Sequence, residues 1–163
     1  MTTLRICITG HRWNKIDRAL RPQLEASLRE AFGTLASREA RTTLVCGMAE
    51  GTDLVAASVR PREWALEAVL PLPAPTWRRH LAATSDLGDA EEFDRLLPGA
   101  SVVVLPHRSG PDYAALARYL AETSQVLVAV WDGLAPKPGG TGEVIALARA
   151  RGARVIVLPT PRA

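Results

Sequence analysis

The chain alternates short apolar runs with longer segments in which apolar residues recur at helical spacing. Several of the short runs are continuously apolar, as expected of strands that are buried on both faces of a parallel sheet. We expect six strands, at residues 4–9, 42–46, 65–70, 101–105, 125–130 and 154–158. These runs would supply every strand of the predicted fold.

Three apolar stripes lie between the runs, and we expect each to pack on the sheet as one face of a helix. They consist of Leu20, Leu24, Leu28, Phe32 and Leu35, of Tyr113, Leu116, Ala117 and Leu120, and of Val144, Leu147 and Ala148. The acidic stretch from Asp86 to Asp94 is predicted to form a loop and a short helix on the surface. The alternation predicts an α/β fold of the Rossmann-like, doubly wound type, with a mainly parallel sheet and helices on both faces. We expect a single domain spanning residues 1–163.

The composition is that of a globular protein, with 47% hydrophobic and 23% charged residues, which excludes a disordered chain. No apolar run approaches the roughly 20 residues of a membrane span, and the N-terminus lacks a signal-peptide pattern. We therefore expect a cytoplasmic protein without membrane contact. Cys7 and Cys46 lie in apolar runs and are expected to be free, buried thiols. Two cysteines and three scattered histidines predict no metal site, and we expect no cofactor beyond a nucleotide-type ligand.

The charge is unevenly distributed along the chain. Residues 1–62 hold ten basic and six acidic residues, residues 63–123 five and nine, and residues 124–163 five and two. The net charge of +3 is small for a protein that binds a polyanion. The basic ends of the chain indicate a local field for a small anion, so a nucleic-acid partner is not expected.

The candidate chemistry follows the strands, because a sheet of this type binds ligands beyond the carboxyl ends of its strands. The candidate residues are Gly10, His11 and Arg12 after the first strand, Gly47, Met48, Ala49, Glu50, Gly51, Thr52 and Asp53 after the second, Trp131, Asp132 and Gly133 after the fifth, and Gly139, Gly140, Thr141 and Gly142 before the last helix. Two of these segments are glycine-rich turns that lead into a helix, a combination that favours phosphate binding. Neither turn has the P-loop or the GxGxxG pattern. We therefore predict a nucleotide or a nucleotide derivative as ligand.

Each candidate has two interpretations. Arg12 is expected to bind phosphate, or to pair with a surface acid. His11 contacts a ligand or stabilises its turn by a hydrogen bond. Asp132 is a candidate for a ribose hydroxyl, and Trp131 stacks on a base or belongs to the core. Asp53 is expected to stabilise the first turn of its helix, with ligand contact as the alternative.

At these turns the sequence resembles the SLOG superfamily of Rossmann-like nucleotide-binding domains. This superfamily includes DNA-processing protein A, the YpsA-like proteins and the Lonely Guy proteins once labelled lysine decarboxylases. The resemblance runs over nearly the whole chain and rests on the segments 10–12, 47–53, 70–73, 85–97, 129–133 and 139–142. It implies a domain that binds or senses a nucleotide-derived small molecule and forms a homodimer.

Phosphoribohydrolases of the Lonely Guy type carry the motif P-G-G-x-G-T-x-x-E, whose last residue serves N-glycosidic cleavage. In the corresponding run, from Pro138 to Ala146, Glu143 stands at the position of Thr and Ala146 at that of the final Glu. As an alternative function we therefore consider a nucleotide N-glycosidase or phosphoribohydrolase that uses Glu50 or Glu143. Both carboxylates also suit a helix N-terminus. A second alternative is binding of single-stranded DNA, which no arginine-rich stretch with interleaved aromatic residues supports.

Overall fold

The computed structural model describes residues 2–135 and 137–161, and it confirms the predicted α/β fold. Six strands form one sheet in the order β4-β3-β2-β1-β5-β6, and every pair of neighbours is parallel. The strands are β1 (Thr2–Gly10), β2 (Ala40–Cys46), β3 (Ala65–Leu70), β4 (Ala100–Val104), β5 (Val126–Trp131) and β6 (Arg154–Pro159). The strand order reverses between β1 and β5, which places a crevice at the carboxyl ends of these two strands.

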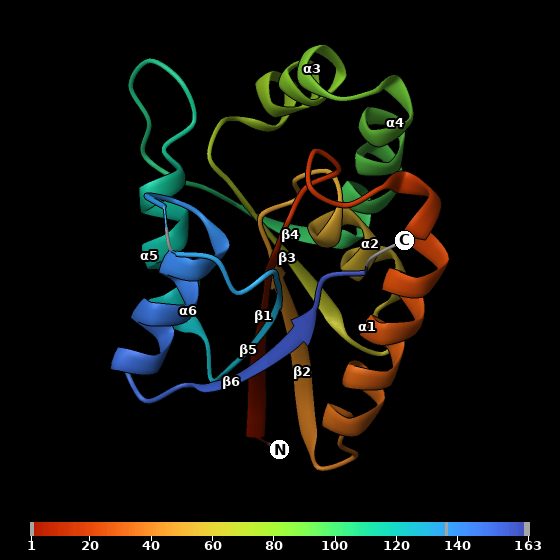
Figure 1. Cartoon of the computed structure of the whole chain (residues 1–163), viewed down its shortest axis with the longest axis vertical. Coiled ribbons are helices and arrows are strands. Elements are labelled where there is room, and N and C mark those ends of the chain that lie inside the picture. Colours follow the sequence, from red (N-terminus) through yellow and green to blue (C-terminus); the bar gives the residue numbers. More distant parts are fainter. Residues whose placement is uncertain (1, 136, 162–163) are drawn as a thin grey trace.

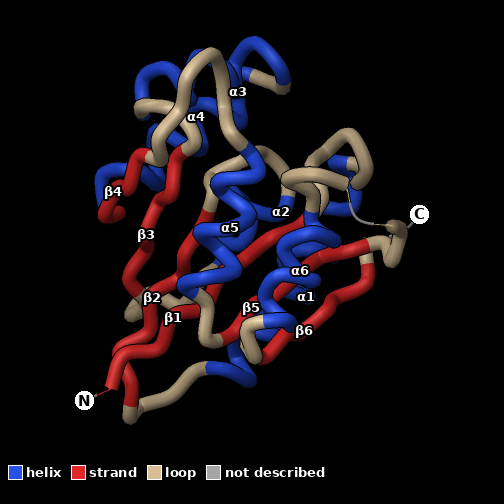
Figure 2. The backbone as a smooth tube through the Cα atoms, turned by 90° about the vertical axis from the view of Figure 1, so that its left-hand side faces the viewer, coloured by secondary structure: helices blue, strands red, loops and turns tan. Residues whose placement is uncertain are grey.

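Helices cover both faces of the sheet. They are α1 (Arg21–Leu35), α2 (Thr52–Val59), α3 (Ala74–Thr84), α4 (Leu87–Leu96), α5 (Tyr113–Thr123) and α6 (Thr141–Ala150), with short 3-10 turns at Arg18–Leu20 and Leu97–Gly99. Figure 1 shows α5 and α6 on one side of the sheet, α1 and α2 on the other, and α3 and α4 at one end of the molecule. Figure 2, turned by 90°, shows α5 and α6 in front of the strands.

Alternate residues of the central strands point into two different cores, as the pleat of a strand requires. In β1, Ile6 and Ile8 pack with α1 to α4, whereas Cys7 packs with α5 and α6. Cys7 and Cys46 are free and buried, as predicted. Burial raises the pKa of the Cys7 thiol to about 12, so this thiol is not reactive at neutral pH.

Two helices differ from the prediction. The sequence did not predict α3. The buried residues of this helix are Trp77 and Leu81, which are too few to form a recognisable apolar stripe. The acidic stretch forms the ten-residue helix α4 and does not lie wholly on the surface. Phe93 belongs to the core, and Asp89 and Glu92 are buried as well. The surface interpretation was wrong here because arginines from another segment neutralise these two acids, as described below.

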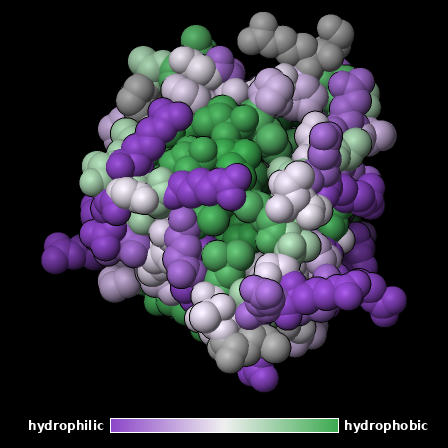
Figure 3. All heavy atoms as spheres, turned by 90° about the horizontal axis from the view of Figure 1, so that it is seen from below, coloured by the Kyte–Doolittle hydropathy of each residue, from purple (hydrophilic) through white to green (hydrophobic). Residues whose placement is uncertain are grey.

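The edge strands expose apolar side chains, among them Val102 and Val104 of β4 and Val157 of β6. Figure 3 shows an apolar area framed by hydrophilic side chains on one face of the molecule. Exposed apolar edges are typical of protein–protein contact surfaces, but the homodimer implied by the resemblance stays a prediction. Within the described residues, no helix combines the length and the apolar composition needed to cross a membrane.

Candidate functional site

A cavity of about 250 Å³ lies at the carboxyl ends of β1 and β5, where the strand order reverses. Five segments form its wall: the loop after β1, the turn before α2, helix α5, the loop after β5 and the start of α6. The lining residues are Thr9, Gly10, His11, Arg12, Asn14, Lys15, Ala49, Asp53, Tyr113, Leu116, Ala117, Leu120, Trp131, Asp132, Leu134, Ala135, Lys137, Gly139, Gly140, Thr141, Gly142 and Val144. The volume lies just below the roughly 300–1,000 Å³ of most ligand pockets.

The cavity brings together many of the predicted site residues, namely Gly10, His11, Arg12, Ala49, Asp53, Trp131, Asp132, Gly139, Gly140, Thr141 and Gly142. The other candidates do not line it, and these are Gly47, Met48, Glu50, Gly51, Thr52, Gly133 and Glu143. Several residues of this second group hold the walls in place, as their contacts show.

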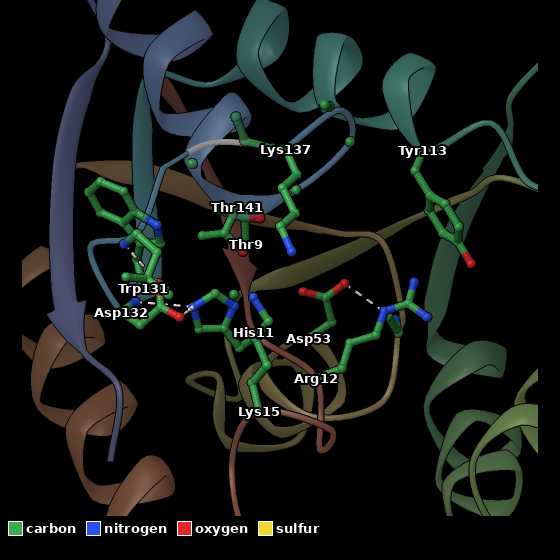
Figure 4. A pocket seen from close by; sticks show the side chains of 18 of the residues that line it. Thr9, His11, Arg12, Lys15, Asp53, Tyr113, Trp131, Asp132, Lys137 and Thr141 are labelled. Atoms are coloured by element: carbon green, nitrogen blue, oxygen red, sulfur yellow. Dashed lines mark hydrogen bonds and ion pairs between the residues drawn. The ribbon is translucent and has the colours of Figure 1, made fainter. Parts of the chain in front are cut away.

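Three cationic side chains, those of Arg12, Lys15 and Lys137, line the cavity. Figure 4 shows Lys15 and Lys137 extending into it from opposite sides. The guanidinium of Arg12 lies 4.9 Å from the ring centroid of Tyr113, and its Nη1 is 3.7 Å from Oε1 of Glu50. Burial lowers the pKa of Arg12, but Glu50, Tyr113 and Asp53 together outweigh burial, and the net direction is upward. Arg12 therefore stays cationic inside the protein.

The turn before α6 places the helix N-terminus at the cavity. Gly139 has φ +73°, and a Cβ there would lie 2.6 Å from Cβ of Tyr113, so only glycine fits. Oε2 of Glu143 accepts a hydrogen bond from the Gly139 amide at 2.5 Å and fixes the turn. Gly140 is the N-cap residue and has no side chain that could cap the helix. The first amides of α6, beginning at Thr141, are thus placed to bind an anion.

The turn before α2 has a different role. Gly51 has φ +90°, and a Cβ there would lie 2.8 Å from Cα of Arg12. The hydroxyl of Thr52 donates to the backbone oxygen of His11 at 2.9 Å. Met48 is buried and has φ +58°. This turn is therefore packed against the loop after β1 and shapes that loop. Of the two predicted phosphate turns, only the turn before α6 has all its glycines in the lining of the cavity.

His11 links the carboxyl ends of β1 and β5. Its Nε2 accepts a hydrogen bond from the backbone amide of Asp132 at 3.1 Å, and Oδ2 of Asp132 lies 3.3 Å from the same nitrogen. Burial lowers the pKa of His11, in agreement with a neutral ring that carries its proton on Nδ1. The amide of Leu134 donates to Oδ1 of Asp132 and lowers the pKa of that carboxyl. His11 thus makes the turn-stabilising hydrogen bond that was one of its two interpretations.

Asp53 is the carboxyl group that the cavity shares with α2. Its Oδ2 accepts a hydrogen bond from the Ala49 amide at 3.2 Å. Burial raises the pKa of Asp53 to about 7, against the opposing effects of this hydrogen bond and of Arg12, while the charge of Glu50 raises it further. The carboxyl therefore exchanges its proton near neutral pH, a property that is frequent at functional sites.

Sequence reasoning missed several lining residues, of which Lys15 and Tyr113 matter most. Lys15 follows Arg12 by three residues in the same loop, and its amide donates to the Arg12 oxygen at 3.0 Å. This short spacing was a signal that could have identified it. Tyr113 belongs to an apolar stripe that was expected to pack on the sheet, and only its position at the start of α5 brings it beside Arg12.

Among the described residues, no group of three His, Cys, Asp or Glu side chains is arranged to hold a metal ion. No family model matches the chain, and none of the curated proteins matches it. The relationship to the SLOG superfamily therefore stays a prediction, and the cavity is the basis on which a function can be argued.

Proposed function

We propose that the cavity binds a phosphorylated small molecule of the nucleotide type. One observation carries this proposal: Arg12, Lys15 and Lys137 line the same cavity as the N-terminus of α6. Ammonium and guanidinium groups bind phosphate through charge-assisted hydrogen bonds, and a helix N-terminus adds backbone donors and a favourable dipole. Four features that each favour an anion thus act on one small volume.

The remaining wall suits the sugar and base of such a ligand. Trp131, Tyr113 and Leu116 contribute apolar surface, and the Asp132 carboxylate can accept a hydrogen bond from a hydroxyl group. A cavity of about 250 Å³ matches a sugar phosphate or a mononucleotide better than a dinucleotide. We therefore infer a ligand that presents one phosphorylated sugar to the protein.

The two alternatives gain less support. Glu50 and Glu143 lie outside the cavity lining, and Glu143 is occupied by the Gly139 amide, so their positions do not favour a glycosidase that uses either of them. Binding of single-stranded DNA relies on an extended groove with stacked aromatic side chains. A cavity of this volume favours a small molecule instead.

Titration calorimetry and thermal unfolding with ribose 5-phosphate and adenosine 5′-monophosphate test the proposal. We expect both to bind, and a ligand at 100 times its dissociation constant to add about 2.7 kcal/mol to the free energy of unfolding. Ribose and adenosine are the matched controls and should bind at least about tenfold more weakly, because they lack the anion. Absence of binding by both phosphorylated compounds would contradict the proposal.

A pair of variants locates the phosphate. Gly140→Asp places a carboxylate at the N-cap of α6, whereas Gly140→Asn adds a side chain of the same shape without the charge. The new Cβ would lie 3.2 Å from the Lys137 oxygen in both variants, so they share any steric cost. We expect Gly140→Asp to lower the affinity for ribose 5-phosphate at least about tenfold more than Gly140→Asn does. Equal losses would place the phosphate away from this turn.

A further inference from the structure

Asp53 is an acidic group in the wall of a cavity whose other charged lining groups are mostly cationic. Protein atoms surround its carboxyl group, which keeps part of its surface open to the cavity. The Ala49 amide holds Oδ2, which fixes the orientation of the side chain. Figure 4 shows the carboxyl group facing the space between Lys15 and Lys137. Any anion bound in this cavity would therefore share it with the carboxyl group of Asp53.

The charges around Asp53 come from every neighbouring element. The loop after β1 contributes His11, Arg12 and Lys15, the turn before α6 contributes Lys137, and Asp132 follows β5. Glu50 precedes Asp53 in its own turn, Tyr113 begins α5, and the Cys46 thiol of β2 donates to the Asp53 backbone oxygen at 3.3 Å. His11 is neutral and Arg12 shares its charge with Glu50, so Lys15 and Lys137 would contribute most of the compensation for a second negative charge.

A bound anion changes the balance at Asp53. Two negative charges inside one small cavity repel each other, so an ionised Asp53 opposes the entry of phosphate. A protonated Asp53 removes this repulsion and also gains an O–H that can donate to a ligand oxygen. The group is suited to this exchange because burial already raises its pKa to about 7.

We propose that Asp53 takes up a proton from solvent when the cavity binds an anion, so that the protein captures a phosphate-type ligand together with one proton. This inference rests on the proposed function and adds the residue that determines in which protonation state the complex forms. Binding then weakens as the pH rises above the range in which free Asp53 is protonated. The effect follows from the linkage between proton binding and ligand binding.

Inorganic sulfate is the probe for this test, because it remains a dianion throughout the neutral pH range and does not itself exchange protons. Titration calorimetry between about pH 6.5 and pH 8.5, in buffers that differ in ionisation enthalpy, measures both affinity and proton uptake. We expect the affinity to fall by up to about tenfold per pH unit above about pH 7, with uptake that rises toward about one proton per sulfate. Ribose 5-phosphate serves as the second probe.

Asp53→Asn supplies the decisive comparison, since an amide imitates the neutral carboxyl group and can still accept the Ala49 hydrogen bond. We expect this variant to bind sulfate with an affinity that does not depend on pH, and without proton uptake. Lys15→Met is the matched control, because it removes a charge from the same cavity: binding should weaken at every pH, while proton uptake persists. If Asp53→Asn does not fold, the pH and buffer dependence of the unmodified protein still decides.

Three results would overturn the inference. Sulfate affinity that is the same at low and high pH, or proton uptake that persists in Asp53→Asn, would each show that Asp53 does not carry the proton. In both cases binding itself remains, and the proposed function is untouched. If neither sulfate nor ribose 5-phosphate binds at any pH, the proposed function and this inference fail together.

Discussion

Three carboxyl groups near the cavity, those of Glu50, Asp53 and Glu143, each lie close to a helix N-terminus but have different surroundings. Glu143 accepts a hydrogen bond from the Gly139 amide and fixes a turn. Glu50 lies 3.7 Å from Arg12 through one oxygen, while its other oxygen is buried without a partner among the described residues. Asp53 alone of the three lines the cavity. The three residues thus share a carboxyl group and a place near a helix N-terminus, and their different neighbours determine what each carboxyl group does.

The raised pKa of Asp53 predicts a pH-dependent stability. The folded protein holds this proton up to about pH 7, whereas an unfolded aspartate loses it near pH 4. The stability linked to Asp53 is therefore fully present at low pH and is lost as the pH rises to about 7. Between pH 5 and pH 8, we expect the free energy of unfolding of Asp53→Asn to rise by about 2 kcal/mol relative to that of the unmodified protein. This value is smaller than the full pKa shift implies, because water in the cavity screens the carboxylate. Urea unfolding in anion-free buffer measures this gain, and parallel pH profiles would contradict it.

At the scale of elements, the start of α6 is the part of the candidate site whose structure is most directly suited to binding an anion. The positive φ of Gly139, the absence of a capping side chain at Gly140 and the hydrogen bond to Glu143 together leave the helix N-terminus open. The start of α5 packs directly against this turn, because Cβ of Tyr113 lies 2.6 Å from the position that a Cβ of residue 139 would take. Ligand affinity should therefore depend on contacts that hold the turn as well as on groups that touch the ligand.

Glu143 provides the test at this scale. Glu143→Ala removes the acceptor of the Gly139 amide, and we expect it to lower the free energy of unfolding by about 1 kcal/mol and to weaken binding of ribose 5-phosphate. Glu143→Gln keeps an acceptor oxygen and should retain most of the affinity. Calorimetry and thermal unfolding of the two variants decide. Equal losses of affinity in both would show that the charge of Glu143, and not its hydrogen bond, supports binding.

At the scale of the whole molecule, ion pairs join the 3-10 turn after β1 and the start of α1 to α4. Nη2 of Arg18 lies 2.6 Å from Oδ2 of Asp89, and Nη1 of Arg21 lies 3.0 Å from Oε2 of Glu92. These contacts show that the uneven charge distribution also stabilises the fold. Part of the basic excess of residues 1–62 neutralises buried acids of residues 63–123, so the charge split does not serve the cavity alone.

Asp89 allows this connection to be measured. Burial raises its pKa, but the hydrogen bonds from Arg18, Ser85 and Trp13 and the charge of Arg18 together lower it overall. Stability from Asp89 is thus present at neutral pH and is lost as the pH falls through the lowered pKa. We expect Asp89→Asn to cost about 2 kcal/mol in urea unfolding at pH 7 and less in strong acid.

Asp94→Asn, in the same helix, is the control for this prediction. Its partner Arg78 lies 2.7 Å away, but both side chains of this pair are exposed. We expect a cost below about 1 kcal/mol, since exposed ion pairs contribute little. If the two variants cost the same, burial of the Asp89 pair does not matter for stability.

Local patterns in the sequence predicted all six strands, most of the helices and the edge of the sheet at which the candidate site lies. Continuous apolar runs specify parallel strands, and glycines such as Gly51 and Gly139 specify turns, because these signals depend on local sterics and on burial alone. The predicted loop residues Arg12 and Asp132 do line the cavity. Such features can be predicted because they follow from short-range patterns.

Which side chains face the cavity depends on how the elements pack together in three dimensions. Tyr113 enters it from an apolar helical stripe, whereas Glu50 and Glu143, which lie in the glycine-rich turns, do not line it. The ionisation of Asp53 likewise depends on burial and on Arg12, which lies far from it along the chain. The physical reason is that burial and electrostatic interaction are set by distance in space, which the packing of β1, β5, α5 and α6 alone establishes.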